Sequence, residues 1–567
     1  MTAEFDYIIV GGGAAGCVLA NRLSAKSSTR VLLLEAGEDT PPGHEPADVL
    51  DTFATSYYNK AYMWPQLKAH WRTRDTSPEV TFDQARVMGG GSTVMGMVAL
   101  RGTPDDYDEW EQMGATGWNW QNVLPYFRRL ETDLDFSGEL HGHNGPVPIR
   151  RTPRARWAPL TRAVDQYALE RQIPYVADMN GDFRDGYCSL PMSNTEKSRA
   201  SSAICYLDAS VRRRMNLQIA SGAQVTGFVR EGRRVTGVTV TIGQKPYRFQ
   251  TREIILCAGG VHSPAMLLRA GIGPAQHLKD VGIDVIVDHP GVGANLQNHP
   301  LLFIGLHLRR AARQDPAIRP HPMTCFRYSS SRPGAPQNDM YTIVHSKSSW
   351  NALGYQIGNI TTQLLKPASR GRVTLTGPET ARPPRIEFNF VGEDLDLVRF
   401  MDGFRRIVDI TAHPAVTALC TTIFPVRFTD RIRRLNQLTR ANALKTAAIA
   451  AGLDLMPGIA RFALERLNGR RVDLAALVAD DAALADHIRE NVAGTFHVSG
   501  ICRMGSLDDP GAVVDSAGRV RMLSGLRIVD ASIMPTVPRA NTNIPVIMLA
   551  EKIADGMSRE GTASAAA

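Results

Sequence analysis

The chain has 567 residues, of which 43% are hydrophobic and 21% charged, and its mean hydropathy is −0.17. This composition excludes a disordered, collagen-like or coiled-coil protein. The length predicts two or three domains, or one pair of domains built from interleaved segments of the chain. No run of about 18 apolar residues occurs, so no membrane-spanning helix is predicted. The net charge is +8, but the lysines and arginines are interspersed with acidic residues along most of the chain. This distribution argues against nucleic acid as a partner.

The N-terminus and the cysteines both favour a cytoplasmic protein. Residues 1–6 contain no basic segment followed by an apolar one, so no secretory signal is predicted. The seven cysteines are odd in number, and several of them, such as Cys257, lie in apolar surroundings. We therefore expect reduced, buried thiols, with neither a disulfide framework nor a metal site.

The first 37 residues predict a dinucleotide-binding unit. Two short apolar, β-branched runs at residues 5–10 and 30–34 predict buried strands, and a helical pattern lies between them. The first strand leads into the motif Gly-x-Gly-x-x-Gly, formed by Gly11, Gly13 and Gly16. Such a turn lets the backbone approach a pyrophosphate at a helix N-terminus. Glu35 follows 19 residues after the motif, where an acid can accept hydrogen bonds from ribose hydroxyls.

Four further regions carry recognisable motifs. They are a glycine-rich run at residues 85–93, a segment at 260–273, a segment at 290–300, and the C-terminal stretches 497–505 and 529–545. Together with the first motif, these regions resemble the signatures of the glucose–methanol–choline (GMC) family of FAD-dependent oxidoreductases. The resemblance covers nearly the whole chain.

The resemblance implies an α/β fold (α+β overall), in which discontinuous segments form a Rossmann-like FAD-binding domain. We expect residues 1–310 to bind FAD, with part of 156–200 contributing to a second, substrate-binding domain. Alternating polar and apolar runs predict an antiparallel sheet with helices in that domain, residues 311–486. Residues 487–557 are expected to return to the FAD domain, and the Ala/Ser/Gly-rich tail 558–567 to fray.

The resemblance also implies which residues contact FAD. Val225 is expected to contact adenine through its main chain, and Trp64 to pack near the cofactor. Family members carry an Asn or His close to the isoalloxazine where this chain has Met95, so we expect FAD to be held non-covalently. The predicted FAD contacts are Gly11, Gly13, Ala14, Ala15, Gly16, Glu35, Ala36, Trp64, Met88, Gly89, Ser92, Met95, Gly96, Val98, Val225, Ala258, Asp530, Ala531, Asn543 and Pro545.

The same resemblance places His497 as the base that removes the hydroxyl proton of an alcohol while a hydride passes to flavin N5. A histidine suits this role because its ordinary pKa of about 6.5 leaves it mostly neutral near pH 7. Asn543 matches the second active-site residue of the family, whose amide can stabilise a developing alkoxide. Leu364 and Phe496 are expected to line the substrate pocket, which favours a primary alcohol that is aryl, furanic or moderately apolar.

Three other histidines in or beside the motif regions, His262, His289 and His299, are interpreted as structural or surface residues. Two other activities within the family stay open. Hydroxynitrile lyases share the fold and hold FAD without using it as a redox partner. Fatty-acid photodecarboxylases also belong to the family, but they replace the catalytic histidine, so His497 argues against that activity.

The electron acceptor and one basic segment are less closely defined. Oxygen and a quinone or another carrier are both compatible with the motifs. Residues 427–472 concentrate arginines around an apolar stretch. This pattern predicts either a solvated helical cap over the substrate domain or a weak contact with an anionic membrane surface.

Overall fold

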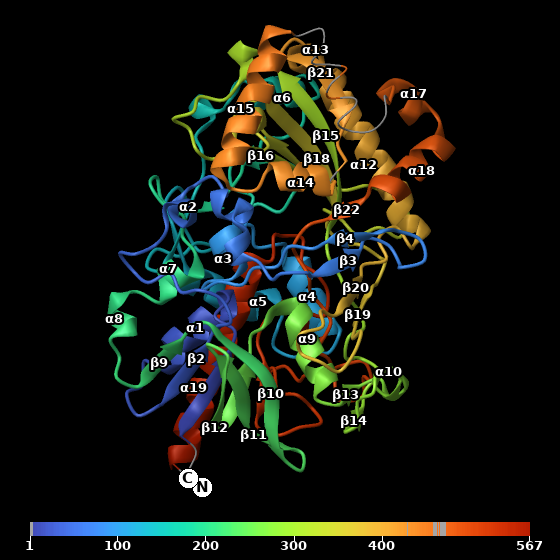
Figure 1. Cartoon of the computed structure of the whole chain (residues 1–567). Coiled ribbons are helices and arrows are strands. Elements are labelled where there is room, and N and C mark those ends of the chain that lie inside the picture. Colours follow the sequence, from blue (N-terminus) through green and yellow to red (C-terminus); the bar gives the residue numbers. More distant parts are fainter. Residues whose placement is uncertain (1–3, 428, 457–461, 463, 465–471, 567) are drawn as a thin grey trace.

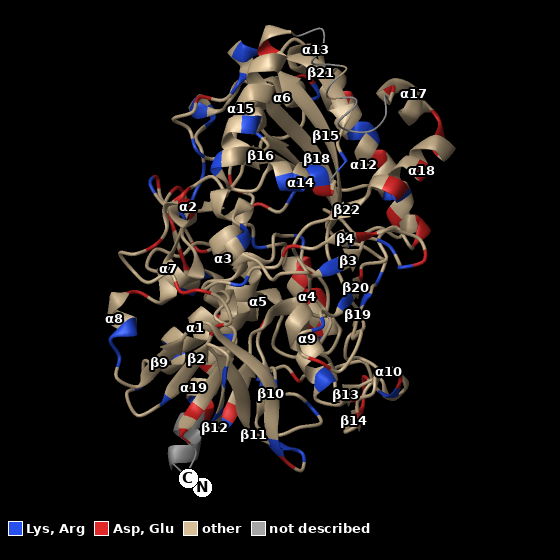
Figure 2. Cartoon of the chain, in the orientation of Figure 1, with Lys and Arg blue, Asp and Glu red and all other residues tan. Residues whose placement is uncertain are grey.

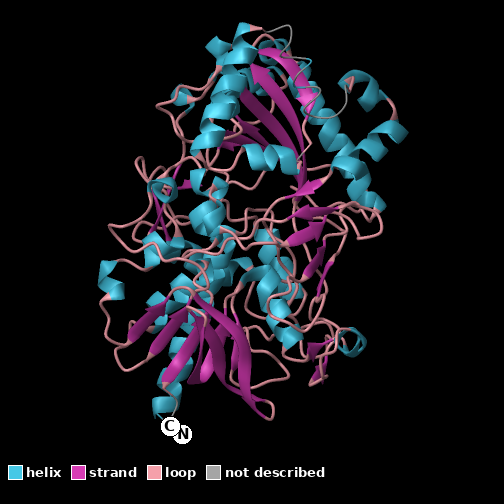
Figure 3. Ribbon diagram, viewed as in Figure 1, coloured by secondary structure: helices cyan, strands magenta, loops and turns pink. Residues whose placement is uncertain are grey.

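The computed structural model describes residues 4–427, 429–456, 462, 464 and 472–566. In these ranges two sheet-centred regions are stacked end to end, and both chain termini lie at the same end (Figure 1). Figure 3 shows one large sheet near the termini and another at the opposite end. None of the helices within these ranges is long and apolar enough to cross a lipid bilayer.

The sheet near the termini is built around β1 (Phe5–Val10) and has the strand order β10-β11-β12-β1-β2-β9. Strand β1 pairs in parallel with β2 (Val31–Leu34) and β12 (Lys245–Leu256), and β23 (Leu526–Ile528) pairs with β12. Every residue of β2 is buried, as expected for a parallel strand covered on both faces. The outer strands are β9 (Leu217–Ala220), β10 (Ala223–Glu231) and β11 (Arg234–Ile242).

Helix α1 (Ala14–Leu23) follows β1 directly and packs against the last helix, α19 (Asn543–Ala566). Their apolar side chains share one core with β1 and β2, so the N-terminal and C-terminal segments form a single domain. The other helices of this half are α2 (Ala47–Leu50), α3 (Gly91–Val94), α4 (Pro104–Gln112), α5 (Trp120–Leu130), α7 (Ser202–Tyr206), α8 (Ala209–Arg212), α9 (Gly259–Arg269) and α10 (Ala275–Asp280).

The second large sheet has the strand order β21-β15-β18-β17-β16-β7, with β22 paired to β15, and all its pairs are antiparallel. Its strands are β7 (Gly186–Ser189), β15 (Pro300–Leu308), β16 (Pro322–Tyr328), β17 (Met340–His345), β18 (Ile357–Leu364), β21 (Cys420–Pro425) and β22 (Ala493–Gly494). Helix α12 (Asp394–Ala412) packs on β18 from one face. The surrounding helices are α6 (Pro159–Glu170), α11 (Ala352–Gln356), α13 (Pro414–Thr417), α14 (Asp430–Leu435), α15 (Arg440–Leu455), α17 (Leu474–Ala479) and α18 (Asp481–Asn491).

The remaining elements among the described residues form smaller sheets and short 3-10 turns. The three minor sheets contain β3 (Lys68–His70), β4 (Glu79–Thr81), β19 (Arg372–Thr374) and β20 (Arg385–Glu387); β5 (Glu131–Asp133), β6 (Val147–Arg150) and β8 (Met192–Ser193); and β13 (Ile272–Gly273) with β14 (Val287–Asp288). Single 3-10 turns are η1 (Thr55–Tyr58), η2 (Lys60–Tyr62), η3 (Arg154–Arg156), η4 (Arg310–Ala312) and η5 (Ala531–Ile533).

The predicted α/β fold is confirmed, but two details of the predicted organisation differ. Strand β15 begins at Pro300 and already belongs to the second sheet, before the expected boundary at residue 310. The tail was expected to fray from residue 558, yet α19 continues to Ala566. Alanine has the highest helix propensity, and Glu560 forms an ion pair with Arg527 at 2.9 Å, which explains the helical tail.

Candidate active site

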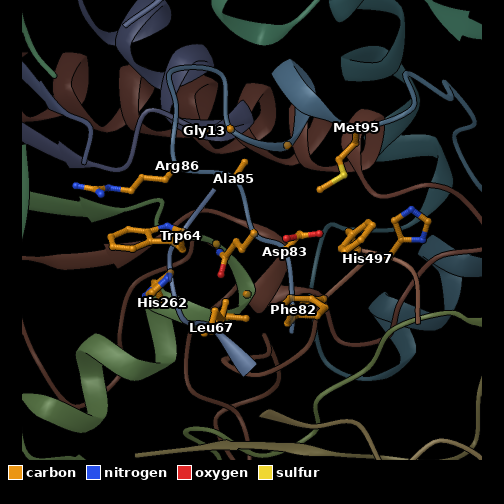
Figure 4. Close-up of a pocket in the computed structure, with 18 of the residues that line it drawn as sticks. Gly13, Trp64, Leu67, Phe82, Asp83, Ala85, Arg86, Met95, His262 and His497 are labelled. Carbon is orange, nitrogen blue, oxygen red and sulfur yellow. The ribbon is translucent and has the colours of Figure 1, made fainter. Parts of the chain in front are cut away.

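A cavity of about 890 Å³ lies between the two halves of the molecule. Its lower wall comes from the turn after β1 and the segment that contains α3, and its upper wall from β15, β17 and β18. Figure 4 shows Met95 and His497 together at one side, and Trp64 between Arg86 and His262 at the other. The Trp64 ring lies 4.4 Å from the His262 ring and 5.0 Å from the Arg86 guanidinium carbon.

The turn between β1 and α1 has the shape that a dinucleotide needs. A Cβ atom at Gly11 would lie 2.4 Å from the Cys257 carbonyl oxygen, whereas Gly13 meets nothing closer than 3.9 Å and lines the cavity. Gly13 is also the N-cap of α1 and provides no side-chain cap. The first backbone N–H groups of α1 therefore lie beside the cavity, where they can bind a pyrophosphate.

Glu35 completes this cradle at the end of β2. Its two carboxylate oxygens accept hydrogen bonds from the backbone N–H groups of Gly12 and Gly37, each at 2.7 Å. These bonds hold the buried carboxylate at the cavity wall, where an oxygen retains lone pairs for a ribose hydroxyl. The cradle thus fits the nucleotide half of FAD.

Most predicted FAD contacts lie on the wall of this cavity, and four do not. The residues on the wall are Gly11, Gly13, Ala14, Ala15, Glu35, Ala36, Trp64, Ser92, Met95, Gly96, Val98, Val225, Ala258, Asp530, Ala531 and Asn543. Gly16, Met88, Gly89 and Pro545 do not line the cavity. Gly16 has no Cβ, which lets α1 pack against the carbonyl of Gly11. The Gly89 N–H donates to the Gly12 carbonyl at 2.6 Å, so both glycines stabilise the glycine turn without lining the cavity.

His497 is anchored by a hydrogen-bond network whose polarity can be assigned. The His497 backbone N–H donates to Asn298 Oδ1 at 2.9 Å, and Asn298 Nδ2 donates to the Thr495 carbonyl at 2.7 Å. Since Asn298 Oδ1 only accepts, the Thr495 hydroxyl donates to it at 2.7 Å. A lone pair of the Thr495 hydroxyl oxygen therefore faces His497 Nδ1 at 2.9 Å. Nδ1 is then the donor, which assigns the imidazole proton to Nδ1.

This tautomer leaves the lone pair of His497 on Nε2, at the atom that Asn541 Nδ2 approaches at 3.1 Å. His299 lies on the other side, with its Nδ1 2.9 Å from His497 Nδ1. Burial, and to a smaller degree the neighbouring His299, hold the pKa of His497 well below its usual value of 6.5. The imidazole is neutral at physiological pH and can accept a proton at Nε2.

The hydrogen bond to His497 comes from Asn541, two residues before the predicted Asn543. Asn543 lines the same cavity but is the first residue of α19. The two asparagines sit in one Asn-Thr-Asn run, so spacing alone could not separate them. His299 was likewise interpreted as structural, although its ring contacts the ring of His497 at a centroid distance of 5.0 Å.

The predicted pocket residues have different outcomes. Phe496 lines the cavity, with its ring 5.6 Å from that of Tyr57 and 5.7 Å from that of Phe82. The prediction for Leu364 was wrong: this side chain is fully buried in the core of the second sheet. Successive residues of a strand face opposite sides, so its neighbour Gln363 lines the cavity instead.

A dinucleotide cradle that shares one cavity with a half-buried, neutral histidine is the arrangement of a nucleotide-cofactor oxidoreductase. The chain belongs to the GMC oxidoreductase family: models of the family's N-terminal and C-terminal parts match residues 5–301 and 367–550. It is an FAD-dependent oxidoreductase that acts on alcohols.

Several known proteins are similar over nearly the whole chain. The 5-(hydroxymethyl)furfural oxidase of Methylovorus sp. (strain MP688) is 38% identical over 98% of each chain. An oxygen-dependent choline dehydrogenase of Vibrio vulnificus (strain YJ016) is 31% identical, over 98% of this chain and 94% of the relative. Among solved structures, pyridoxine 4-oxidase from Mesorbium loti is 26% identical with a TM-score of 0.81, covering 98% of this chain and 99% of the other.

Proposed function

We propose that this chain oxidises a primary ring-bearing alcohol, aryl or furanic, to the aldehyde, with His497 as the base. The observation that carries the proposal is the neutral His497, whose Nε2 carries the lone pair in a cavity walled by aromatic rings. FAD, when bound, accepts the hydride from the carbinol carbon. Two of the similar proteins are named as a 5-(hydroxymethyl)furfural oxidase and a pyridoxine 4-oxidase.

In this proposal the residues around the hydroxyl divide the work. His497 takes the hydroxyl proton at Nε2, and Thr495 holds the proton already present on Nδ1. The Asn541 amide lies 3.1 Å from Nε2; once the hydroxyl occupies the Nε2 lone pair, this amide donates to the hydroxyl oxygen instead and stabilises the charge that develops there. This assignment gives Asn541 the role that the sequence suggested for Asn543.

The wall of the cavity favours an uncharged alcohol over a quaternary ammonium substrate. Asp83 is a carboxylate beside the aromatic wall, where it accepts a hydrogen bond from Tyr57 at 3.1 Å. It is already paired with Arg433 at 2.6 Å and with Lys60 at 3.0 Å. A substrate cation would compete with these two fixed cations for Asp83, so this carboxylate is not a free counter-ion for a quaternary ammonium group.

We further propose that FAD is bound non-covalently and that oxygen is the first electron acceptor to test. Met95 lines the cavity, and its thioether offers no imidazole nitrogen for a flavin bond. The name of one relative describes an oxidase and that of another an oxygen-dependent enzyme. A quinone or another carrier is the alternative acceptor.

The basic segment 427–472 is better explained as a cap than as a membrane contact. Part of it, including residues 457–461, 463 and 465–471, lies outside the described residues. In the described part, Arg433 of α14 points back to Asp83, and Thr429, Asp430 and Arg433 line the cavity. Figure 2 shows charges of both signs scattered over the molecule.

The test is anaerobic mixing of the purified protein with benzylic, furanic and aliphatic alcohols while flavin absorbance is followed, and then admission of air. Bleaching by a ring-bearing alcohol supports the proposal, and rapid recolouring in air identifies an oxidase. Persistent bleaching identifies a dehydrogenase that needs another acceptor. Cyanohydrin cleavage without bleaching, or blue-light-dependent release of carbon dioxide, would replace the proposal with the lyase or the photodecarboxylase.

A further inference from the structure

A second imidazole, that of His299, contacts His497 at Nδ1. The two Nδ1 atoms are 2.9 Å apart, and the ring planes meet at 76°. His299 directly precedes β15 and is fully buried, and it does not line the cavity that contains His497. Any effect of His299 on the reaction must therefore pass through His497.

The direction of the contact follows from the hydrogen bonds around Thr495. The Thr495 hydroxyl donates to Asn298, so the proton of the His497 ring is on Nδ1. Two protons cannot both lie between nitrogen atoms 2.9 Å apart, so His299 presents a lone pair at Nδ1. The Nδ1–H of His497 thus faces two acceptors, Thr495 Oγ1 and His299 Nδ1, each at 2.9 Å.

The surroundings of the other nitrogen of His299 agree with this assignment. A lone pair at Nδ1 requires the proton of the neutral ring to be on Nε2. Nε2 is buried and makes no hydrogen bond of normal geometry among the described residues. The backbone carbonyls of Leu365 and Pro538 favour protonation of the ring, as acceptors that face an N–H do. A buried N–H without a good partner is destabilising, so the contact with His497 is what holds this tautomer.

The charge next to His299 keeps its imidazole neutral. Burial, and then the ammonium group of Lys366, lower the pKa of His299 to about 3. Lys366 Nζ is fixed in place by Glu109 Oε2 at 2.5 Å and by the Val537 carbonyl at 3.3 Å, and it lies 3.6 Å from Asp106 Oδ1. His299 therefore keeps its lone pair at Nδ1 over the whole pH range in which His497 can act as a base.

A neutral acceptor at this position affects the two forms of His497 unequally. When Nε2 of His497 has taken a proton, the ring is an imidazolium and its Nδ1–H is a charged donor. Hydrogen bonds from charged donors are stronger than those from neutral ones. The lone pair of His299 thus stabilises the imidazolium more than the imidazole, which favours transfer of the hydroxyl proton to Nε2.

We propose that His299 is a positioning residue for proton abstraction, whose Nδ1 lone pair accepts the Nδ1–H of His497 and stabilises the imidazolium that forms there. It also holds the tautomer of His497 that has its free lone pair at Nε2. This inference rests on the proposed function of His497 as the base, and it adds a second acceptor beside Thr495. His299 thus has a role in the reaction, beyond the structural role that its sequence position suggested.

The first test compares two substitutions of nearly equal shape. His299→Asn places an amide oxygen close to the position of Nδ1, whereas His299→Leu places a methyl group there. Anaerobic flavin reduction is followed by stopped-flow absorbance with benzyl alcohol, or with furfuryl alcohol if it reacts faster. The leucine variant should show a maximal rate about tenfold lower or more, with little change in the half-saturating alcohol concentration. The asparagine variant should recover most of this rate. Equal rates in the two variants would show that only packing was lost, and would overturn the proposal.

The second test combines His299→Leu with Thr495→Val. Since both residues accept from one N–H, each single variant still has the other acceptor, and the double variant has neither. The double variant should therefore be slowed by more than the product of the two single effects. A fall equal to the product or smaller would show that His299 and Thr495 do not share the Nδ1 proton, and would overturn the proposal.

A third measurement needs no variant of His299 to fold. In the wild type labelled with ¹⁵N in the histidine rings, NMR distinguishes protonated from unprotonated ring nitrogens. The signals that disappear in His497→Ala should include a protonated Nδ1 and an unprotonated Nε2. The opposite pattern would place the shared proton on His299 and overturn the proposal.

The outcomes separate this inference from the proposed function. If no alcohol bleaches the wild type, the proposed function fails, whereas the tautomers are still measured by NMR. Reduction of His497→Ala at the wild-type rate would remove the base itself. If His497→Ala is slow and His299→Leu reacts like the wild type, the role of His299 alone is overturned.

Discussion

Asn541 donates a hydrogen bond from Nδ2 to Nε2 of His497 across 3.1 Å, although the two residues are 44 positions apart. The segment before α19 is held next to residues 497–499 by Gln297, whose side chain bonds to the backbone of Pro535 and Val537 and whose backbone bonds to Ser499. This segment places an amide donor at Nε2, the atom that we propose receives the proton of the alcohol. His497 and Asn541 are therefore brought together only by the interleaved architecture of the chain.

Replacement of His497 should separate flavin binding from flavin reduction. His497→Ala removes the proton acceptor but leaves the cradle at Gly13 and Glu35 untouched, so the protein should stay yellow. Anaerobic reduction by a substrate alcohol should slow by about 100-fold or more. Stopped-flow absorbance measures the rate, with His143→Ala as the matched control. Reduction at the wild-type rate would eliminate His497 as the base.

The two asparagines give a direct comparison within one Asn-Thr-Asn run. Asn541→Ala removes the donor that reaches Nε2 of His497 and should slow flavin reduction by roughly 10²-fold. Asn543→Ala should have a clearly smaller effect on flavin reduction. Asn543 is the first residue of α19, and the hydrogen bond to His497 comes from Asn541. Single-turnover reduction of both variants with the same alcohol measures the difference. The opposite order of effects would restore the prediction made from the sequence.

Thr495 is a positioning residue whose effect should depend on its hydroxyl. Thr495→Val keeps the shape but no longer accepts a hydrogen bond from the Nδ1–H of His497, so this tautomer keeps only His299 Nδ1 as a partner at that atom. We expect kcat to fall about tenfold or more, and the acid limb of the pH profile to move. Thr495→Ser should recover most of the rate. A valine variant with the wild-type rate and pH profile would contradict the assigned tautomer.

The pH dependence of the reaction follows from the lowered pKa of His497. A base works in its deprotonated form, and a pKa well below 6.5 keeps that form populated as the solution becomes acidic. The second-order rate constant for flavin reduction should therefore stay level from about pH 8 to below about pH 6, and fall only at lower pH. Stopped-flow measurements across this range check the sign. If the rate constant instead fell with a midpoint near pH 6.5, the ordinary pKa of histidine, the pKa of His497 in the free enzyme would not be lowered by burial.

The cap assigned to α14 can be distinguished from a membrane-binding segment. Since Arg433 is paired with Asp83 at 2.6 Å, the protein should not sediment with anionic phospholipid vesicles at low salt. Arg433→Gln should loosen the cap and raise KM for the alcohol several-fold, without loss of bound FAD. Co-sedimentation of the wild type with such vesicles, lost on addition of salt, would instead support a surface contact.

Much of the nucleotide-binding half could be predicted from the residues themselves. The strand at residues 5–10, the glycine turn and Glu35 were predicted from contiguous sequence, because a tight turn, a buried strand and a helix start are local steric consequences of a few neighbouring residues. The segment around His497 was likewise recognisable as a unit. These features depend little on what the remainder of the chain does.

The tertiary structure decided which side chains face each other. Successive residues of β18 face opposite sides of the sheet, so Gln363 lines the cavity and Leu364 does not. Which side faces the cavity follows only from the packing of α12 on the opposite face of the sheet. The bond from Asn541 and the contact of His299 join residues from distant segments. Sequence by itself determined the cradle and singled out His497 as the proposed base. The environment of that base depends on sheet register and interdomain packing, which are properties of the whole fold.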